Sequence, residues 1–500
     1  MKRTWILVLA LLIVAPAIVM ATGQAPQEQP TTIKFLCFNQ RPAGMDAVIA
    51  EAERRMKNTL NIKLDWIMLP FDQWKTKKDL SLASGEPNDL MFDAPWAGMN
   101  TAIDAGYYTP LDDLLEKYGQ NIIANHGRQV IDNNRFNGKV MGIPQVGTQS
   151  GAQYWVVRKD IREKIGFPPI KTYDDLIKFA YAVKAKAPDI VPIFTVDGYT
   201  LFAHQHLWVE EKGSPDFYVW GSQLGFPDDN LILYTTGLKP VIKNFLADKD
   251  PKLWKWILEA NKLYNDGILF KDMPMVKDYL YFKNGKFAAW LWNDIGSDRA
   301  YFGELKTNAP GAVFEYVFLK PMQKGNMSSD FRAWNFTTIA SVSKNKEKAM
   351  QFLNWTNIKE NYDLMVYGIE GKNWAAVGPD RYRTLNTDYP WFSYTFSWNA
   401  KLSRISADLT DAEFQKVKYD MDPNNFVPIP WAGFIFDTTP VTNEVAQYTA
   451  LLAKYYRPLF GGFGNPDEYY NNFKSEALDI TVKIQKELQK QLDAYMAKKK

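Results

Sequence analysis

The chain has 500 residues, 46% of them hydrophobic and 15% aromatic, and a formal net charge of only +3 at pH 7. This near-balance of acidic and basic residues argues against a nucleic-acid partner, because proteins that bind a polyphosphate backbone usually carry an excess of basic residues. A chain of this length exceeds what one hydrophobic core usually organises, so we expect two or more lobes.

The amino terminus has the pattern of a secretory signal peptide. Two basic residues precede an apolar run from Trp5 to Val14, and Val19-Met20-Ala21 fits the small-residue rule for cleavage. Because the run is short for a membrane span, residues 1–21 are predicted to be removed on export. A lipid anchor would need a cysteine just after the run, where Ala21-Thr22-Gly23 stands. The sequence therefore predicts a secreted protein, periplasmic or extracellular, without a lipid-anchor cysteine.

The first third of the chain alternates strands with helices. The hydrophobic spacing predicts strands at Ile33–Phe38, Ile62–Met68 and Leu90–Phe92, and helices at Met45–Leu60 and Asp72–Ser84. This βαβ order implies a parallel sheet. Further on, Asn137-Gly138 predicts a two-residue hairpin turn.

The rest of the chain repeats the alternation. Strands are predicted at Tyr154–Arg158, Val191–Thr195, Phe314–Leu319 and Trp334–Ala340, and helices at Lys159–Ile165, Phe245–Tyr264 and Lys346–Tyr367. Thr172 and Asp175 form a capping box that opens another helix, which runs to Lys186. The last third combines an aromatic-rich loop, Trp374 to Trp398, with two or three closing helices.

One short strand ends in two tryptophans and two polar side chains. On the strand predicted at Ala289–Trp292, Trp290 and Trp292 share one face. Asn293 and Asp294 mark its end, and ligands of open α/β sheets bind beyond the carboxyl ends of strands. Trp292, the nearer to these polar groups, is the better candidate for a ligand platform. For Trp290, a place in the ligand site and a place in the core are equally favoured.

Seven passages along the chain, in order, carry a family resemblance. Four of them resemble extracellular solute-binding proteins of bacterial ABC importers: LSLASGEPNDLMFDA (80–94), YYTPLDDLLEKYGQNI (107–122), FNGKVMGIPQ (136–145) and VVRKDIREKIGFPPIKTYDDL (156–176). Three look like the larger sugar-importing branch of that family, whose members are often lipoproteins: YFKNGKFAAWLWND (281–294), SVSKNKEKAMQFLNW (341–355) and YGIEGKNW (367–374). The resemblance covers nearly the whole mature chain.

The resemblance implies the α/β type II periplasmic-binding-protein fold, with two lobes, crossover hinge strands and a helical C-terminal region. On that template the amino-terminal lobe comprises residues 31–146 and 335–367, and the carboxyl-terminal lobe residues 152–330 and 373–500. The crossovers would fall near 147–153, 331–336 and 368–372, and the ligand would bind between the lobes.

A sugar ring offers an apolar face and an edge of hydroxyls, so its natural receptor is an aromatic platform rimmed by amides and carboxylates. Burying roughly 100 Å² of apolar surface on one platform is worth on the order of 2.5 kcal/mol before entropy losses. By position at strand ends and crossovers, the further candidate ligand-binding residues are Asn39, Gln40, Asp93, Trp96, Tyr154, Trp334, Glu370 and Trp431. For each aromatic the alternative is a packed core side chain, and Glu370 could instead brace a hinge with Lys372.

The function that the resemblance implies is the substrate-binding subunit of an ABC importer. Such a subunit captures a sugar or oligosaccharide in the interlobe cleft and delivers it to a membrane permease, as a monomer and without cofactor, nucleic acid or chemistry of its own. Two alternatives stay open: a receptor of the same fold for a peptide or another solute, and a secreted polysaccharide-degrading enzyme, which would need two carboxylates across the scissile bond.

Two motifs resemble the beginning of a metal site but lack the full ligand set. His204-Gln205-His206 would place both imidazoles on one strand face, but no further ligand run accompanies it. The run Asp420 to Trp431 begins like a calcium loop, yet Asn425 stands where glycine is required and Trp431 where glutamate is required. Neither motif is therefore assigned as a metal site.

Overall fold

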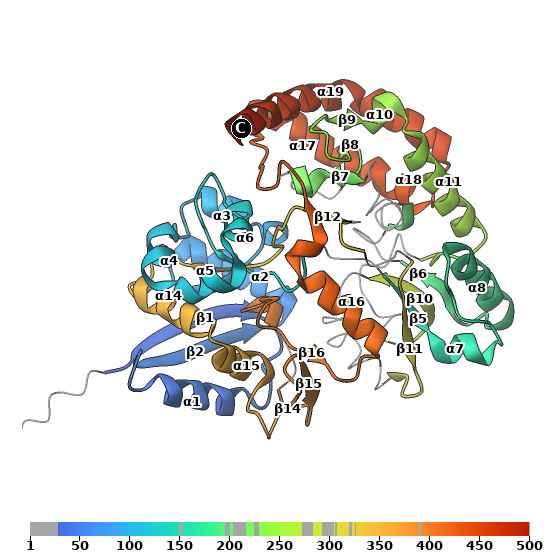
Figure 1. Cartoon of the computed structure of the whole chain (residues 1–500). Coiled ribbons are helices and arrows are strands. Elements are labelled where there is room, and N and C mark those ends of the chain that lie inside the picture. The colour runs from blue at the N-terminus through green and yellow to red at the C-terminus, as the bar shows by residue number, and fades with distance from the viewer. Residues whose placement is uncertain are drawn as a thin grey trace, which may run out of the picture.

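The computed structural model describes residues 29–149, 154–195, 201–203, 217–224, 230–272, 284–292, 305, 308–319, 323–325, 327–389 and 393–499 (Figure 1). Three of the predicted features lie outside these residues. They are the signal peptide, the pair Asn293-Asp294 and the His204-Gln205-His206 run.

The first lobe is built on a five-stranded sheet of order β2-β1-β3-β13-β4. Its strands are β1 (Thr31–Phe38), β2 (Ile62–Leu69), β3 (Leu90–Asp93), β4 (Ile143–Pro144) and β13 (Phe336–Ile339). Strand β1 runs parallel to β2 and β3, which confirms the predicted parallel start. The helices of this lobe are α1 (Met45–Met56), α2 (Phe71–Ser84), α3 (Met99–Asp104), α4 (Asp112–Tyr118), α5 (Gln120–His126), α6 (Arg128–Asn133), α14 (Lys346–Trp355) and α15 (Lys359–Tyr367).

The second lobe is built on a four-stranded sheet of order β11-β5-β10-β6. Its strands are β5 (Tyr154–Arg158), β6 (Val191–Phe194), β10 (Phe287–Trp292) and β11 (Phe314–Val317), and a smaller sheet holds β7 (Tyr218–Trp220), β8 (Leu233–Thr236) and β9 (Lys243–Asn244). The helices are α7 (Lys159–Lys164), α8 (Tyr173–Lys186), α10 (Phe245–Asp248), α11 (Pro251–Asn265), α17 (Thr442–Leu451), α18 (Arg457–Gly461) and α19 (Pro466–Lys499). In Figure 1, α19 arches over this lobe. Of the helices that the structure describes, none is both long and apolar enough to cross a membrane.

Each lobe has its own hydrophobic core. One core gathers residues between Ile33 and Val146 with others between Phe331 and Phe426, and the second gathers residues between Tyr154 and Val317 with others between Ile429 and Leu492. The predicted two-lobed α/β fold is therefore confirmed.

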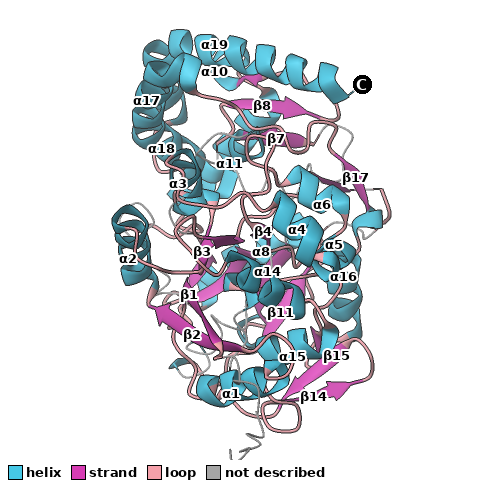
Figure 2. Ribbon diagram, turned by 90° about the vertical axis from the view of Figure 1, so that its left-hand side faces the viewer, coloured by secondary structure: helices cyan, strands magenta, loops and turns pink. Residues whose placement is uncertain are grey.

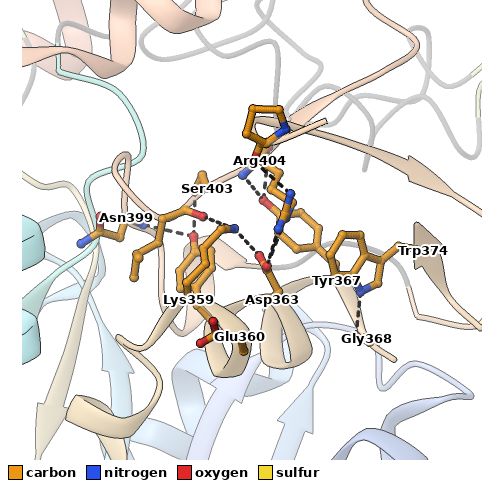
Figure 3. Close-up of polar contacts among 12 residues, drawn as sticks. Lys359, Glu360, Asp363, Tyr367, Gly368, Trp374, Asn399, Ser403 and Arg404 are labelled. Atoms are coloured by element: carbon orange, nitrogen blue, oxygen red, sulfur yellow. Dashed lines mark hydrogen bonds and ion pairs between the residues drawn. The ribbon is translucent and has the colours of Figure 1, made fainter. Parts of the chain in front are cut away.

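A third group of elements sits on the first lobe, contrary to the predicted assignment of residues 373–500 to the second. It contains β14 (Trp374–Val377), β15 (Arg381–Thr384) and β16 (Ile405–Ser406), so the predicted loop 374–398 includes an antiparallel strand pair. Helix α16 (Asp411–Met421) follows and contacts both lobes, since Val417 packs against the second core and Tyr419 against the first. Figure 3 shows the attachment: the buried carboxylate of Asp363 on α15 accepts hydrogen bonds from Lys359, at 2.5 Å, and from two guanidinium nitrogens of Arg404, at 2.9 and 3.0 Å. Such a buried charge pair anchors the 399–404 loop to the first lobe.

Three segments connect the lobes, and the third lies elsewhere than predicted. The chain leaves the first core after Val146, returns to it at Phe331, and leaves it again between Phe426 and Ile429. The predicted third crossover at 368–372 is wrong, because this segment turns from α15 directly into β14 and stays with the first lobe.

Hydrogen bonds join the second connector to the first and to the third. A further hydrogen bond joins the first connector to α16. Strand β12 (Met327–Ser329) pairs in parallel with β17 (Phe426–Pro428), and the hydroxyl of Ser329 donates to the carbonyl of Gln149. The Gln149 N–H in turn donates to the carbonyl of Asp420 on α16, at 2.7 Å. Figure 1 shows β12 and α16 lying between the two lobes.

Two predicted helices are each divided in two. The helix predicted at 245–264 breaks at Lys249, whose φ of 46° is left-handed, and Asp250 then caps α11. The helix predicted at 346–367 breaks after Trp355, where the side chains of Thr356 and Asn357 both donate to the carbonyl of Leu353. In both places a side chain competes with the helical backbone for its hydrogen bonds.

Two local predictions are confirmed. Thr172 and Asp175 form the expected capping box at the start of α8. Asn137 and Gly138 both have positive φ, 48° and 78°, as a two-residue hairpin turn requires, although only a single bridge, Phe136 to Lys139, flanks it.

In the first connector, Gly147 lies directly against the indole ring of Trp398. A β-carbon built on Gly147 would lie 1.7 Å from Cε2 of Trp398. We predict that Gly147→Ala lowers the free energy of unfolding by about 1–3 kcal/mol, because the indole ring must shift. Urea denaturation measures this, with Gly311→Ala as the control, since no atom lies within 4 Å of the added carbon there. The cost should shrink in a Trp398→Ala background, and equal stability of Gly147→Ala and wild type would contradict the packing.

Candidate ligand-binding site

The strand ends of the first sheet meet at one edge. Phe38 pairs with Leu69, so β1 and β2 end together. Strand β13 runs antiparallel to its neighbours, and its first residue, Phe336, pairs with both Asp93, at the end of β3, and Pro144, at the end of β4. Residues that follow β1, β2 and β3 and residues that precede β13 are therefore brought together at the edge where the connectors join the lobe.

The second sheet presents the matching edge. Tyr154, the first residue of β5 after the connector, pairs with Trp292, the last residue of β10. Trp155 pairs with Val317, which ends β11 shortly before the second connector. In both sheets, the edge that carries the predicted site residues therefore faces the connectors.

Three exposed aromatic side chains lie along the edge of the first sheet. Phe71 follows β2 and is 54% exposed, Trp96 follows β3 and is 45% exposed, and Trp334 precedes β13 and is 46% exposed. We call these three residues the aromatic row. Trp96 and Trp334 were predicted, whereas Phe71 was missed, although its place directly after a predicted strand was the same signal.

Buried rings support the row from beneath. The ring of Trp96 lies 6.2 Å from that of Trp74, 6.2 Å from that of Phe92 and 6.4 Å from that of Phe38, measured between centroids. Phe71 lies 5.3 Å from Phe38 and 6.1 Å from Trp74. Since Trp74 and Phe92 are fully buried, the exposed rings rest on a fixed base.

Amide groups rim the row. The indole N–H of Trp96 donates to Oδ1 of Asn335, at 3.0 Å. Asn39 is half-buried and Gln40 exposed at the end of β1, and the Gln40 N–H donates to Oδ1 of Asn39, at 2.8 Å. Flat apolar faces beside amide donors and acceptors suit a ligand with apolar faces and hydroxyl edges.

Asp93 does not belong to this rim, contrary to the prediction. Its carboxylate is fully buried and accepts hydrogen bonds from Lys78, at 2.7 Å, from the hydroxyl of Tyr108, at 2.5 Å, and from the N–H of Ala94, at 2.8 Å. Burial raises the pKa of Asp93, and burial together with the nearby carboxylate raises the pKa of Tyr108 well above its usual value. Lys78 also donates to the carbonyl of Ala97, at 3.0 Å, so the buried pair ties α2 to the segment that carries Trp96.

Three other predicted platforms are core side chains. Trp290 and Trp431 are fully buried in the core of the second lobe, and Tyr154 is buried there with its ring 5.3 Å from that of Tyr316, edge to face. For Tyr154 and Trp431 this burial corrects the prediction, and for Trp290 it decides between the two alternatives in favour of the core.

The structure describes the remaining candidate residues only partly. Trp292 ends β10, but its side chain and the pair Asn293-Asp294 lie outside what the structure describes. Glu370 is exposed in the turn between α15 and β14. Its expected hinge-bracing role with Lys372 is wrong, because that turn joins two elements of the first lobe.

The discounted calcium loop has other contacts. The carbonyl of Asp420 accepts from Gln149, and Oδ1 of Asp422 accepts from the N–H of Asn424, at 2.9 Å. Within the described ranges, no group of three or more His, Cys, Asp or Glu side chains is placed to hold a metal ion.

Two family descriptions match the chain. Residues 39–357 match "Bacterial extracellular solute-binding protein", and residues 430–497 match a "Domain of unknown function" (DUF3502). The first match spans more than half of the chain and includes the whole aromatic row.

The chain is similar over nearly its full length to known proteins. It is 24% identical, over 94% of its length and 91% of the other's, to a carbohydrate ABC transporter substrate-binding protein of Streptococcus pneumoniae serotype 4. The crystal structure of the N-glycan transport solute binding protein NgtS from Streptococcus pneumoniae superposes with a TM-score of 0.74 at 22% identity, over 94% of this chain and 100% of that one. An HMO-binding solute binding protein from Bifidobacterium longum infantis superposes with a TM-score of 0.62 at 16% identity, over 93% and 99%.

The buried pair beneath the row gives a prediction about stability. We expect Lys78→Met to lower the free energy of unfolding by about 3–5 kcal/mol, because it leaves the Asp93 carboxylate buried without its cation. Adding Asp93→Asn should recover part of the loss, since the uncompensated charge is then removed. Urea denaturation of the two variants measures both effects, and a double variant less stable than Lys78→Met would contradict this account.

Proposed function

The chain belongs to the family of bacterial extracellular solute-binding proteins, and from that premise we propose that it captures a sugar or oligosaccharide for an ABC importer. The family predicted from the sequence is thereby confirmed, and membership implies a periplasmic or extracellular location. The relatives are substrate-binding subunits, and their descriptions name carbohydrate and N-glycan transport.

The aromatic row is the observation that carries the carbohydrate proposal. Each exposed ring offers a face to the C–H groups of a sugar, worth on the order of 2.5 kcal/mol per platform before entropy losses. The amides of Asn39, Gln40 and Asn335 lie at the same edge, where hydroxyls would reach them. Two or three platforms with rim hydrogen bonds would give binding of about −8 kcal/mol, in the micromolar range.

The second lobe would complete the site from the opposite edge. We infer that Trp292, Asn293 and Asp294 contact the ligand there, because the register of β10 with β5 carries the end of β10 to the connector side of the sheet. Trp292 then serves as a platform and the two polar side chains bind hydroxyls. Glu370 remains a proposed hydroxyl acceptor only.

Ligand binding would close the lobes about the connectors. A ligand favours the closed state only through contacts that it makes with both lobes at once, and these are what the two edges would supply. The closed form then delivers the solute to the permease, with the protein acting as a monomer and catalysing no reaction. We also propose that residues 1–21 direct its export and are removed.

A thermal-shift screen against saccharides tests this function. A saccharide that raises the melting temperature and is recovered intact by mass spectrometry supports the receptor. Hydrolysis of the saccharide would support the polysaccharide-degrading alternative instead, and a shift with peptides alone would support the peptide receptor.

Removing one platform should separate binding from stability. We predict that Trp334→Ala lowers the affinity for the screened saccharide at least tenfold, because it deletes an exposed stacking surface, while the melting temperature stays near that of wild type. Trp431→Ala is the contrasting variant, since its indole is buried and its loss should lower stability by about 3–5 kcal/mol. Isothermal titration and thermal denaturation measure the two quantities. Unchanged affinity of Trp334→Ala would exclude this ring from the site.

A further inference from the structure

Resting on the proposed function, we propose that the aromatic row is a series of consecutive subsites that binds an extended oligosaccharide, with one end near the connectors and the other on Phe71. A receptor for a monosaccharide would need one or two rings that face each other. Here three exposed rings stand on three different strand ends instead.

The order of strands in the sheet sets the direction of the row. Trp334 precedes β13, Trp96 follows β3 and Phe71 follows β2, and the sheet order β2-β1-β3-β13-β4 places these strands progressively farther from β4, which leads into the first connector. The ring centroids of Phe71 and Trp96 are 6.0 Å apart, and β13, which Trp334 precedes, is the neighbour of β3 at a strand spacing of about 4.8 Å. The three rings are therefore set one after another along the edge, as a short chain of linked sugar rings requires.

The outer two rings lie close together. The centroids of Phe71 and Trp96 are 6.0 Å apart and their planes differ by 27°, so the rings are nearly parallel, and each keeps about half of its surface exposed. Linked sugar rings present successive apolar faces in a similar way. The same surface is closed from behind by Phe38 and Trp74 and is therefore shaped before the ligand arrives.

The inner end of the row is tied to the middle. The hydrogen bond from Trp96 to Asn335 joins the middle subsite to the residue next to Trp334. Helix α2, which begins at Phe71, lies beside β1 and β3 in Figure 2 and is held there by Lys78. All three subsites thus belong to one rigid lobe, and their spacing does not depend on closure.

The polar groups along the row favour a carbohydrate over a peptide. Asn39, Gln40 and Asn335 offer neutral amides, which suit hydroxyls. The exposed Arg41 beside Gln40 is already bonded to Asp46, at 2.6 Å, and to the carbonyl of Trp66, at 2.7 Å. The exposed carboxylate of Asp72 adjoins Phe71 at the outer end of the row and can accept hydrogen bonds from hydroxyls.

The chain-length dependence of binding tests the subsites. Wild type and Phe71→Ala are titrated, as the full-length chain, with mono-, di-, tri- and tetrasaccharides of the series that gives the largest shift on an array of linear and branched glycans. We expect wild-type affinity to rise until at least the trisaccharide. Phe71→Ala should lose at least tenfold in affinity for the trisaccharide and longer chains, and less than twofold for the monosaccharide.

A matched control lies on the same helix. Leu80 is also exposed on α2, so Leu80→Ala removes a comparable apolar side chain away from the row and should leave affinity unchanged at every length. Melting temperatures of both variants are measured alongside, and Phe71→Leu should restore part of the lost affinity if apolar contact is the cause.

The outcomes separate the two proposals. Equal affinity of Phe71→Ala and wild type for long chains, or an equal loss at every length, overturns the subsites while leaving the carbohydrate receptor intact. If no saccharide on the array binds, the proposed function falls and the subsites fall with it. Binding of tripeptides in place of glycans overturns both.

Discussion

Strand β13 is the constraint on which both lobes depend. It lies in the first sheet between β3 and β4, although in the sequence it comes after all four strands of the main sheet of the second lobe. The side chain of Gln145 shows the result locally, because its Nε2 donates to Oγ1 of Thr337, 192 residues away, and to the carbonyl of Phe396. The chain must therefore cross to the second lobe and return before it can supply β13 to the sheet of the first lobe. The first two connectors are a consequence of this strand order.

The same insertion creates the ligand-binding edge. Because β13 is antiparallel to β3, its beginning lies beside the end of β3, and Trp334 is brought next to Trp96. The pair of Lys78 and Asp93 then fixes α2 against this edge and thereby positions Phe71 and Trp74. A carboxylate that looks like a ligand-binding group in sequence is therefore part of the support for the aromatic surface above it.

The connectors form a small structure of their own. The first and second are joined by the hydrogen bond from Ser329 to Gln149, and the second and third by the pairing of β12 with β17. Phe331 adopts a left-handed φ of 53°, and the side chain of Asn134 bonds both to its carbonyl and to the N–H of Ala333. Such a conformation is costly for a bulky residue and persists only where its surroundings enforce it.

Local signals in the sequence predicted most elements well. Apolar periodicity located the strands β1, β2, β5 and β10 to within about two residues, and the side chains of Thr172 and Asp175 located the start of α8. Apolar periodicity failed at Lys249 and at Thr356-Asn357. At both places the apolar pattern continues, but side-chain hydrogen bonds to the backbone divide the predicted helix in two.

The sequence by itself determined the two-lobed α/β class, the family and the positions at which strand ends bring aromatic and amide side chains. Only the tertiary structure decided which of those side chains face solvent. Trp96 and Trp290 both lie at or near a strand end, yet one is half exposed and the other fully buried. Likewise, the 399–404 loop joins the first lobe through the contacts of Asp363 with Arg404. Burial depends on which distant segments cover a position, and a local pattern of residues carries no information about that cover.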